Sequence, residues 1–412
     1  MNKIIVIFIL FLITSFVFGW YKTYNLSEDT QRFRSFVELP DSRLVWIADV
    51  IDSTKKTTML WTNADGDSLK ALIYEGFRPW FIELSADSLN LILIGFQESL
   101  DSSSTVLLKT DHEGMVIDTK HYRILEDTYP NTFTVCPDSG FFLSGCDFPD
   151  TRIWFLKIDK DGETQWTQIY DWGVPYSPYE AIVASDGSYY IFSSWWDTMY
   201  VFQPFYLHLN KVGEIIKEEW PPLEDRDVYS AVLSGDTAVC LFGTAISDMG
   251  FYYNPWVCLV DTMLNVIWER SYDYGIDAYF HSAERKENGD YVTEIVLGYD
   301  IGLAWFDSHD IDTLMTMRYF TPGSLEIYGK LRLLSNGDIG LASNFRVPPS
   351  FNYNPLAFRV DSLGNHVISN ISENVNRPKK LSLSAYPNPF NSAVTISFDF
   401  GSESAKPLST IE

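Results

Sequence analysis

The segment Phe155–Tyr170, FLKIDKDGETQWTQIY, contains the pattern that decides the fold. An apolar alternating run leads into an acidic turn, and a second alternating run ends in an aromatic residue. The pattern recurs at intervals of 46 to 54 residues. With the Asp or Asn that opens each turn as a landmark, the copies fall at Asn63, Asp111, Asp159, Asn210, Asp261, Asp307 and Asp361. A unit this short, without helical periodicity, cannot form its own core and must stack on its neighbours.

Each copy divides into four strand-like runs separated by turns. In the third copy these runs are TFTVC, FFLSGC, RIWFLKID and ETQWTQIY, joined by PDSG, a loop and KDG. Seven copies of four strands predict an all-β fold, a seven-bladed β-propeller with four-stranded blades, over residues 20–372. In the fifth and sixth copies Leu264 and Asp310 replace the glycine of the landmark turn, so we expect those two turns to differ.

Aromatic residues recur in the last strand of the copies. Tyrosines stand eleven residues after the landmark at Tyr74, Tyr122, Tyr170 and Tyr272, and tryptophans four residues earlier at Trp166 and Trp268. We interpret them as blade-to-blade packing residues, because a buried aromatic ring removes a large apolar area from water. The segment Trp20–Tyr24 repeats the W-x-x-x-Y spacing, which predicts a lone fourth strand that completes the last blade and closes the ring. The last copy has a fourth-strand candidate of its own in GNHVISNIS, so this blade has either a displaced strand or five strands.

The composition limits the partners. The 412 residues include 30 basic and 55 acidic side chains, a net charge of −25. Nucleic acids and anionic membrane surfaces are therefore excluded as partners, since both require clustered Lys and Arg. Residues 1–19, MNKIIVIFILFLITSFVFG, predict a secretory signal peptide cleaved before Trp20, with an uncleaved anchor as the alternative. We expect a secreted or cell-surface protein that passes through the periplasm and keeps no transmembrane segment after cleavage.

Four cysteines in an exported chain raise the question of disulfides. Cys240 and Cys258 fall in the second and third strands of one copy, so a bridge between them is sterically plausible. Cys136 and Cys146 flank a hairpin without facing each other directly. Buried free thiols are the alternative for both pairs.

The repeat ends at Ser372. Residues 373–380 read as a linker, and residues 381–412 contain two strand-like runs around the motif YPNPFN: Tyr386, Pro387, Asn388, Pro389, Phe390 and Asn391. This motif, followed by an alternating strand, resembles the start of the C-terminal sorting domain of the type IX secretion system of Bacteroidetes-like bacteria. The resemblance implies a small β-sandwich-like module and the secretion machinery as a partner. Family members continue with further strands, so the module is expected to be truncated here. A Pro-rich turn in a small terminal β-module is the alternative. The propeller copies are, more weakly, similar to secreted bacterial propellers built on a D-x-x-G-x-x-x-W-x-x-x-Y unit.

We find no catalytic motif. HExxH, GxSxG, the P-loop and GxGxxG are missing, and the six histidines are scattered without ligand spacing. No cofactor is expected except calcium, whose candidate ligands are Asp159, Asp161 and Glu163, with a second set at Asn63, Asp65 and Asp67. These oxygens alternate as in a calcium loop, but a hairpin turn selects the same residue types.

Aromatic loops before the third strands are the candidate binding site. They carry Trp195, Trp196, Tyr252, Tyr253, Trp256 and Tyr353, and they emerge on one face of a propeller. Such rings either bind a sugar or a protein, or fold inward to cap the core. We therefore predict a monomeric, non-enzymatic binding module for a glycan or protein ligand. A secreted carbohydrate-active enzyme, lyase or glycosidase, and a structural surface-layer component are the alternatives.

Overall fold

The computed structural model describes residues 21–24, 30–51, 56–98, 103–126, 128–147, 152–172, 176–196, 202–223, 225–247, 252–298, 300–307, 314–319, 325–346, 353–364, 382–386 and 395–399. The chain divides into two units, Met1–Val367 and Ile368–Glu412. No helix in the described ranges has the length and hydropathy needed to cross a bilayer.

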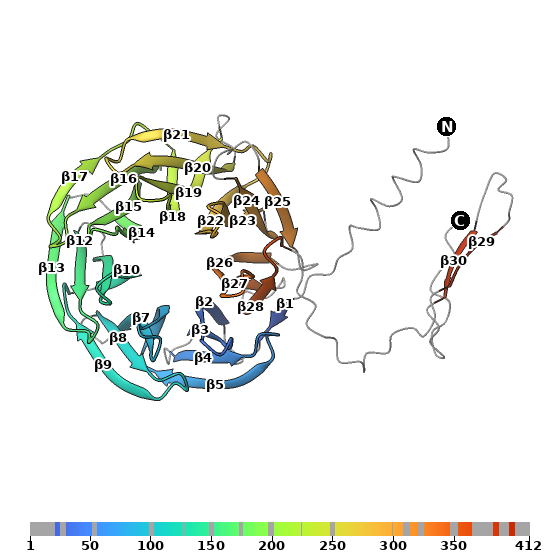
Figure 1. Cartoon of the computed structure of the whole chain (residues 1–412), viewed down its shortest axis with the longest axis horizontal. Coiled ribbons are helices and arrows are strands. Elements are labelled where there is room, and N and C mark those ends of the chain that lie inside the picture. The colour runs from blue at the N-terminus through green and yellow to red at the C-terminus, as the bar shows by residue number, and fades with distance from the viewer. Residues whose placement is uncertain are drawn as a thin grey trace. The chain divides into compact units, whose positions relative to one another are not determined.

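The first unit consists of seven antiparallel four-stranded sheets, which confirms the predicted seven-bladed propeller. Figure 1 shows the blades arranged radially, with the first strand of each blade innermost. Blade 1 contains β2 (Thr30–Glu38), β3 (Leu44–Ile51), β4 (Lys56–Thr62) and β5 (Ser68–Glu75). Blade 2 contains β6 (Arg78–Leu84), β7 (Leu91–Glu98), β8 (Ser103–Thr110) and β9 (Val116–Tyr122). Blade 3 contains β10 (Thr128–Val135), β11 (Phe141–Asp147), β12 (Arg152–Ile158) and β13 (Thr164–Asp171).

The remaining blades follow the same order. Blade 4 contains β14 (Tyr176–Val183), β15 (Tyr189–Trp196), β16 (Phe202–Leu209) and β17 (Ile215–Glu219). Blade 5 contains β18 (Arg226–Leu233), β19 (Ala238–Ile246), β20 (Tyr253–Asp261) and β21 (Val266–Ser271). Blade 6 contains β22 (Ala278–Arg285), β23 (Tyr291–Leu297), β24 (Asp300–Phe306) and β25 (Leu314–Tyr319). Blade 7 contains β26 (Leu325–Leu333), β27 (Ile339–Arg346), β28 (Asn354–Val360) and β1 (Tyr21–Thr23).

The N-terminal strand closes the ring. β1 pairs antiparallel with β28, Tyr21 opposite Phe358 and Thr23 opposite Leu356. Among the described residues blade 7 has four strands, with β1 as the fourth, so the prediction that this strand completes the last blade is confirmed. The competing candidate GNHVISNIS lies outside the described residues beyond Gly364.

The landmark residue is explained by its hydrogen bonds. In five copies its side-chain Oδ1 accepts the backbone N–H groups two and four residues later: Asn63, Asp111, Asp159, Asn210 and Asp261. Such a short oxygen-bearing side chain stabilises a tight turn locally. The expectation of a different fifth turn is wrong, because Leu264 adopts the left-handed φ of 61° and donates its N–H to Asp261 O as the glycines do. Its fully buried side chain packs in the core cluster between blades 4 and 5, which offsets the cost of that conformation.

The recurring tyrosines and tryptophans join successive blades, as predicted. Tyr24, Tyr74, Tyr122 and Tyr170 each donate their hydroxyl to the carbonyl of the turn glycine in the next blade, at 2.5–2.9 Å. Among the recurring tryptophans, Trp166 donates its indole N–H to Lys211 O in the next blade. Trp61, in the third strand of blade 1, makes a similar bond to His112 O of blade 2. Because Tyr24 follows β1, the same bond also joins blade 7 to blade 1 at the point of closure.

The turn glycine is required where a ring of the preceding blade covers it. Gly213 has a φ of +84°, and a Cβ there would lie 2.5 Å from Trp166 Cζ3. Gly337, in the turn between β26 and β27, has the same φ, but a Cβ added there would have no contact within 4 Å. We expect Gly337→Ala to lower the free energy of unfolding by about 1 kcal/mol through backbone strain alone, and Gly213→Ala by about 2 kcal/mol. Chemical denaturation of both variants measures the difference, and equal losses would show that the ring contact adds nothing.

Of the two alternatives for Cys240 and Cys258, the structure has the buried free thiols and not the disulfide. In the pairing of β19 with β20, Cys240 lies opposite Leu259, and Cys258 lies opposite Leu241. Adjacent residues of a strand point to opposite faces of the sheet, so the two thiols project from opposite faces of blade 5. Cys258 packs against blade 4, and Cys240 packs against blade 6. Cys136 and Cys146 are also free and buried.

The second unit is described over two strands, β29 (Ser382–Tyr386) and β30 (Thr395–Asp399), which pair antiparallel. They correspond to the two strand-like runs expected on either side of the motif. Of the motif, only Tyr386 belongs to the described residues, so the sorting module stays a prediction.

Candidate functional site

All seven first strands carry a β-bulge at the same level of the propeller. The register with the second strand shifts at Phe33/Ser35, Pro79/Phe81, Pro130/Thr132, Pro178/Glu180, Val228/Ser230, Phe280/Ala283 and Ile327/Lys330. A bulge inserts an extra residue and redirects its side chain, and bulges are frequent beside active sites. We name six of the inserted residues, one from each of the first six blades, the bulge ring: Arg34, Trp80, Asn131, Tyr179, Tyr229 and His281.

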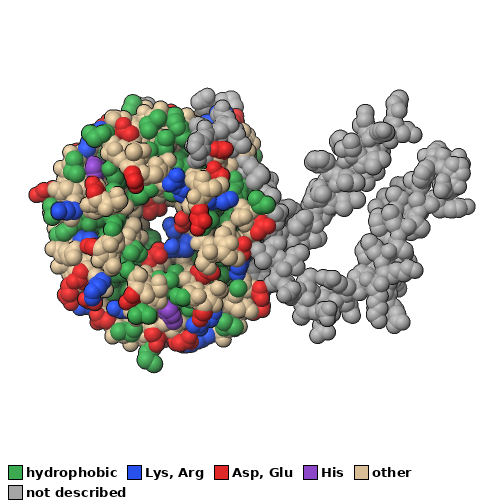
Figure 2. Space-filling model, viewed as in Figure 1, with side chains coloured by type: hydrophobic (Ala, Val, Ile, Leu, Met, Phe, Trp, Pro, Cys, Tyr) green, Lys and Arg blue, Asp and Glu red, His purple; other side chains and the backbone are tan. Residues whose placement is uncertain are grey.

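Five of the six side chains in the bulge ring contact another member from a neighbouring blade. The Arg34 guanidinium lies 5.4 Å from the centre of the Trp80 ring. The Tyr229 ring packs edge-on against Tyr179, with the centroids 5.9 Å apart, and lies 5.8 Å from the His281 ring. These side chains come from the innermost strands and are only half-buried, so they line the centre of the ring. Figure 2 shows that the ring is open at this centre, with acidic and basic side chains around the opening.

Buried polar residues of the second strands hold the bulges in place. Asn344 accepts the N–H of Phe33 at 2.6 Å and donates to its carbonyl at 3.1 Å. Glu294, fully buried, accepts the N–H of Gly329 on both carboxylate oxygens, at 3.1 and 3.2 Å. Each bond joins one blade to the bulged strand of the next and satisfies a backbone group that the bulge leaves without a strand partner.

A charged cluster lies in the same channel. It comprises Glu83, Glu180, Glu284, Lys330 and Arg332 from the first strands of blades 2, 4, 6 and 7. Arg332 forms a two-pronged ion pair with Glu83 and also donates to Ile82 O at 3.2 Å. This pair therefore joins blade 7 to blade 2 across the opening, past blade 1.

Burial raises the pKa values of Glu180 and Glu284, and the nearby Lys330 and Arg332 offset only part of this effect. Carboxyl groups with raised pKa values in a concave site are candidates for proton transfer, although structural networks shift pKa values too. The cluster can thus bind polar groups and hold a proton.

Of the six aromatic residues predicted as the binding site, four have side chains among the described residues, and these four differ in exposure. Trp195 and Trp196 end β15, opposite Gln203 and Phe202, and their side chains lie outside the described residues. Tyr253 is 40% exposed and Tyr252 is half-buried. Tyr353 is half-buried, with the guanidinium groups of Arg32 and Arg346 at 4.6 and 5.6 Å from its ring centre.

Trp256 is a correction to the predicted site. Its side chain is fully buried, and its indole N–H donates to Glu269 Oε2 at 2.7 Å. Alternation along β20 turns this ring into the core between blades 4 and 5, so it is not available to a ligand.

The calcium candidates make other contacts. Asp159 Oδ1 accepts the N–H groups of Asp161 and Glu163, both at 2.9 Å, while the two latter carboxylates contact Lys160 and Lys120. No group of three or more His, Cys, Asp or Glu side chains in the described part of the chain is arranged to hold a metal ion.

Sequence reasoning missed the bulge ring and the charged cluster. One available signal was a proline that recurs in three first strands, at Pro79, Pro130 and Pro178, directly before the inserted residue. Proline cannot donate to a strand ladder, so its repetition at one level indicates an irregular register there.

Comparisons with known proteins support the propeller fold. No protein-family model and no curated protein matches the chain. Among solved structures, hydrazine synthase from Kuenenia stuttgartiensis aligns with a TM-score of 0.55 and 12% identity, over 81% of this chain and all of the other. A catalytically inactive virginiamycin B lyase from Staphylococcus aureus aligns with a TM-score of 0.53 and 12% identity, over 82% and 99% of the two chains.

The β-propeller domain of the Trilobed protease from Pyrococcus furiosus gives a TM-score of 0.52 at 12% identity, over 80% and 96% of the two chains. At this identity the likeness establishes the fold alone. The chain is a seven-bladed β-propeller with a bulge-lined central channel, a scaffold that also serves several enzymes.

Proposed function

We propose that this chain is an exported, non-enzymatic binding propeller that takes a glycan at the mouth of its central channel. The observation that carries the proposal is the bulge ring. It places aromatic side chains, Trp80, Tyr179 and Tyr229, at the same level of the ring as the hydrogen-bonding side chain of Asn131. A sugar presents apolar ring faces and hydroxyl groups, so it needs both kinds of contact in one concave site.

Export and localisation rest on the sequence. The signal peptide at residues 1–19 and the motif beginning at Tyr386 support a secreted or cell-surface protein, with the secretion machinery as a partner. We further propose that the protein acts as a monomer, because β1 closes the ring within one chain and leaves blade 7 complete. The net charge of −25 makes nucleic acid an unsuitable ligand.

A glycan array and polysaccharide affinity measurements on the full mature chain test this function. Trp80→Ala and Tyr179→Ala are each expected to weaken binding about tenfold, a typical loss for an aromatic contact at a binding site. Trp220→Ala is the matched control, because this exposed tryptophan follows an outer strand, where it packs on Phe205. Binding that survives both channel substitutions, or falls equally in the control, would contradict the channel as the site. A folded protein that binds no glycan would contradict a glycan ligand and favour a protein partner or a surface-layer role.

A second candidate, a carbohydrate-active enzyme, is favoured by the raised pKa values of Glu180 and Glu284. The general acid of a glycosidase is usually a carboxyl group whose pKa is raised by its surroundings. The same glycans, followed for new reducing ends and unsaturated products, separate the two functions. Turnover that disappears in Glu180→Gln or Glu284→Gln would favour the enzyme over the binding module.

A further inference from the structure

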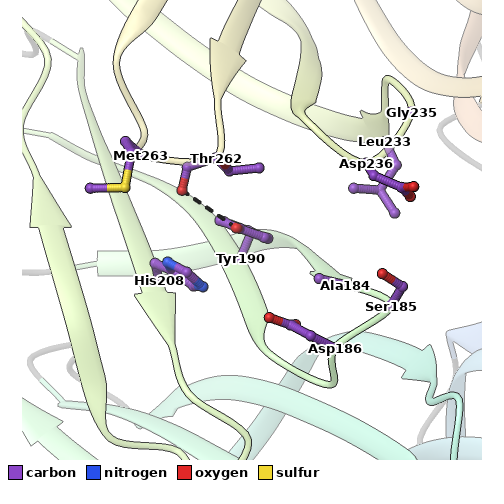
Figure 3. A pocket seen from close by; sticks show the side chains of 10 residues that line it. All are labelled: Ala184, Ser185, Asp186, Tyr190, His208, Leu233, Gly235, Asp236, Thr262 and Met263. Carbon is purple, nitrogen blue, oxygen red and sulfur yellow. Dashed lines mark hydrogen bonds between the residues drawn. The ribbon is translucent and has the colours of Figure 1, made fainter.

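A cavity of about 350 Å³ lies away from the channel, between blades 4 and 5 (Figure 3). Tyr190 and His208, from the second and third strands of blade 4, lie on one side of it. Asp186 comes from a turn of blade 4, and Asp236 and Met263 come from two turns of blade 5. All three turns emerge on the face opposite the loops that carry the predicted aromatic residues, because strand direction alternates within a blade.

Two large side chains that pack the neighbouring boundary are absent from the equivalent positions of this one. Between blades 3 and 4, Trp166 and Tyr189 pack together with their ring centres 5.7 Å apart, and Phe142 stacks on Tyr189 at 4.3 Å. The strand registers place Lys217 at the position of Trp166, and Val239 at the position of Tyr189. Between blades 5 and 6 the same two positions again hold large aromatics, in one core cluster: Trp268 and Tyr291.

Aromatic and anionic groups line this space. The Tyr190 and His208 rings stack at 4.3 Å, nearly parallel at 18°. Asp186 accepts hydrogen bonds from Ser188, which lower the pKa of its carboxyl group and keep it ionised. Asp236 is exposed, and no described residue forms an ion pair with it. Burial lowers the pKa of His208, so the imidazole is neutral at neutral pH, and its buried Nε2 has no hydrogen-bond partner among the described residues.

Lys217 lies near the cavity, but its ammonium group has other partners and does not neutralise the two carboxylates. Lys217 donates to Met263 O, lies 3.4 Å from Asn265 Oδ1 and forms an ion pair with Glu219 at 3.1 Å. The cavity therefore combines two carboxylates, a flat aromatic pair and the apolar side chains of Leu233 and Met263. A planar cation on an apolar stem satisfies all three, by charge pairing, by stacking on the ring and by burial of its methylene groups.

We propose that the cavity between blades 4 and 5 is a binding site for an arginine side chain of a partner polypeptide. The guanidinium group stacks over Tyr190 and pairs with Asp186 and Asp236, and its stem lies against Leu233 and Met263. A chain with a net charge of −25 attracts basic partners over longer distances. This site goes beyond the proposed glycan function, because it lies on a different face and takes a different ligand class.

Methyl NMR of the full mature protein, labelled at the methionine methyl groups, tests the proposal. The chain has only eight methionines, and Met263 lines the cavity, so its signal, assigned through Met263→Leu, reports binding there. The probe is an acetylated, amidated Gly-Arg-Gly peptide, and the control is the same peptide with citrulline, a neutral analogue of arginine. We expect a saturable shift of the Met263 signal with the arginine peptide, and at least tenfold weaker binding of the citrulline peptide.

Substitutions on the protein complete the test. Asp236→Asn and Asp186→Asn are each expected to weaken binding about fivefold to tenfold, while Asp65→Asn, in an exposed turn of blade 1, leaves it unchanged. Val239→Tyr restores the aromatic side chain of the neighbouring boundary and is expected to abolish binding, with folding checked by thermal denaturation. A Met263 signal that does not move at millimolar peptide would overturn the proposal. Equal binding of the citrulline peptide, or unchanged binding in Asp236→Asn, would also overturn it.

Discussion

Replacement of Tyr24 by alanine is expected to lower the free energy of unfolding by about 3–5 kcal/mol and to open the ring. The Tyr24 side chain is 8% exposed, packs against Phe33 at 5.8 Å, and donates its hydroxyl to Gly66 O at 2.7 Å. It joins the end of β1, which pairs with blade 7, to blade 1, and so it acts at the point where the ring closes. Denaturant unfolding measures the loss, and hydrogen exchange measures whether the β1 amides lose their protection.

Tyr122→Ala is the matched control for ring opening. Tyr122 is equally buried and makes the same bond to Gly162 O at 2.7 Å, but it joins blades 2 and 3, away from the point of closure. A similar loss of stability is expected, with β1 exchange unchanged below the global unfolding transition. Equal protection of β1 in the two variants would show that Tyr24 has no special role in closure.

Asp227→Asn is expected to raise the free energy of unfolding by about 3 kcal/mol at pH 8 and to change it little at pH 4. Asp227 is 1% exposed. Burial raises its pKa to about 6, because hydrogen bonds with Ser194 and Tyr229 offset only part of the effect of burial. The usual pKa of an unfolded aspartate is about 3.9, so the folded protein holds this proton more tightly. This contribution to stability is complete below about pH 4 and is lost as the pH rises through about 6. A gap of about two pKa units corresponds to roughly 3 kcal/mol, which asparagine avoids because it does not ionise.

The comparison is made by denaturant unfolding of the variant and the parent protein between pH 4 and pH 8. Asp147→Asn is the control, because this aspartate is also buried but forms an ion pair with Arg152, with Nε to Oδ2 at 2.7 Å. Removal of that charge is expected to destabilise the protein at pH 8, the opposite sign. Destabilisation by Asp227→Asn at pH 8 would contradict the raised pKa.

Much of the ring could be predicted because each copy repeats the same local chemistry. The landmark Asp or Asn, the turn glycine and the tyrosine eleven residues on act together: the first two build a turn, and the tyrosine of the preceding blade bonds to it. A repeated residue whose role is local and identical in each copy leaves a clear signal in one sequence.

Register and direction were much harder to predict. Cys240 and Cys258 miss direct pairing by one residue of strand register, which places them on opposite faces of the sheet. The alternation of side chains along β20 turns Trp256 into the core. The charged cluster was missed because Glu83 and Arg332 lie far apart in the sequence and meet only after the ring closes. The boundary that contains the cavity has Lys217 and Val239 where the neighbouring boundary has Trp166 and Tyr189, a difference that appears only when the two boundaries are compared.

The closure of the ring by β1 also determines the order of folding. The first strand of the chain has its hydrogen-bonding partner, β28, in the last blade, so the pairing of Tyr21 with Phe358 is among the most non-local contacts of the fold. Loop-closure entropy makes such a contact late and slow, and until it forms β28 presents an open edge with unpaired backbone groups. The same bonds can form between two copies as within one. Conditions that delay closure therefore favour strand exchange and aggregation through blade 7.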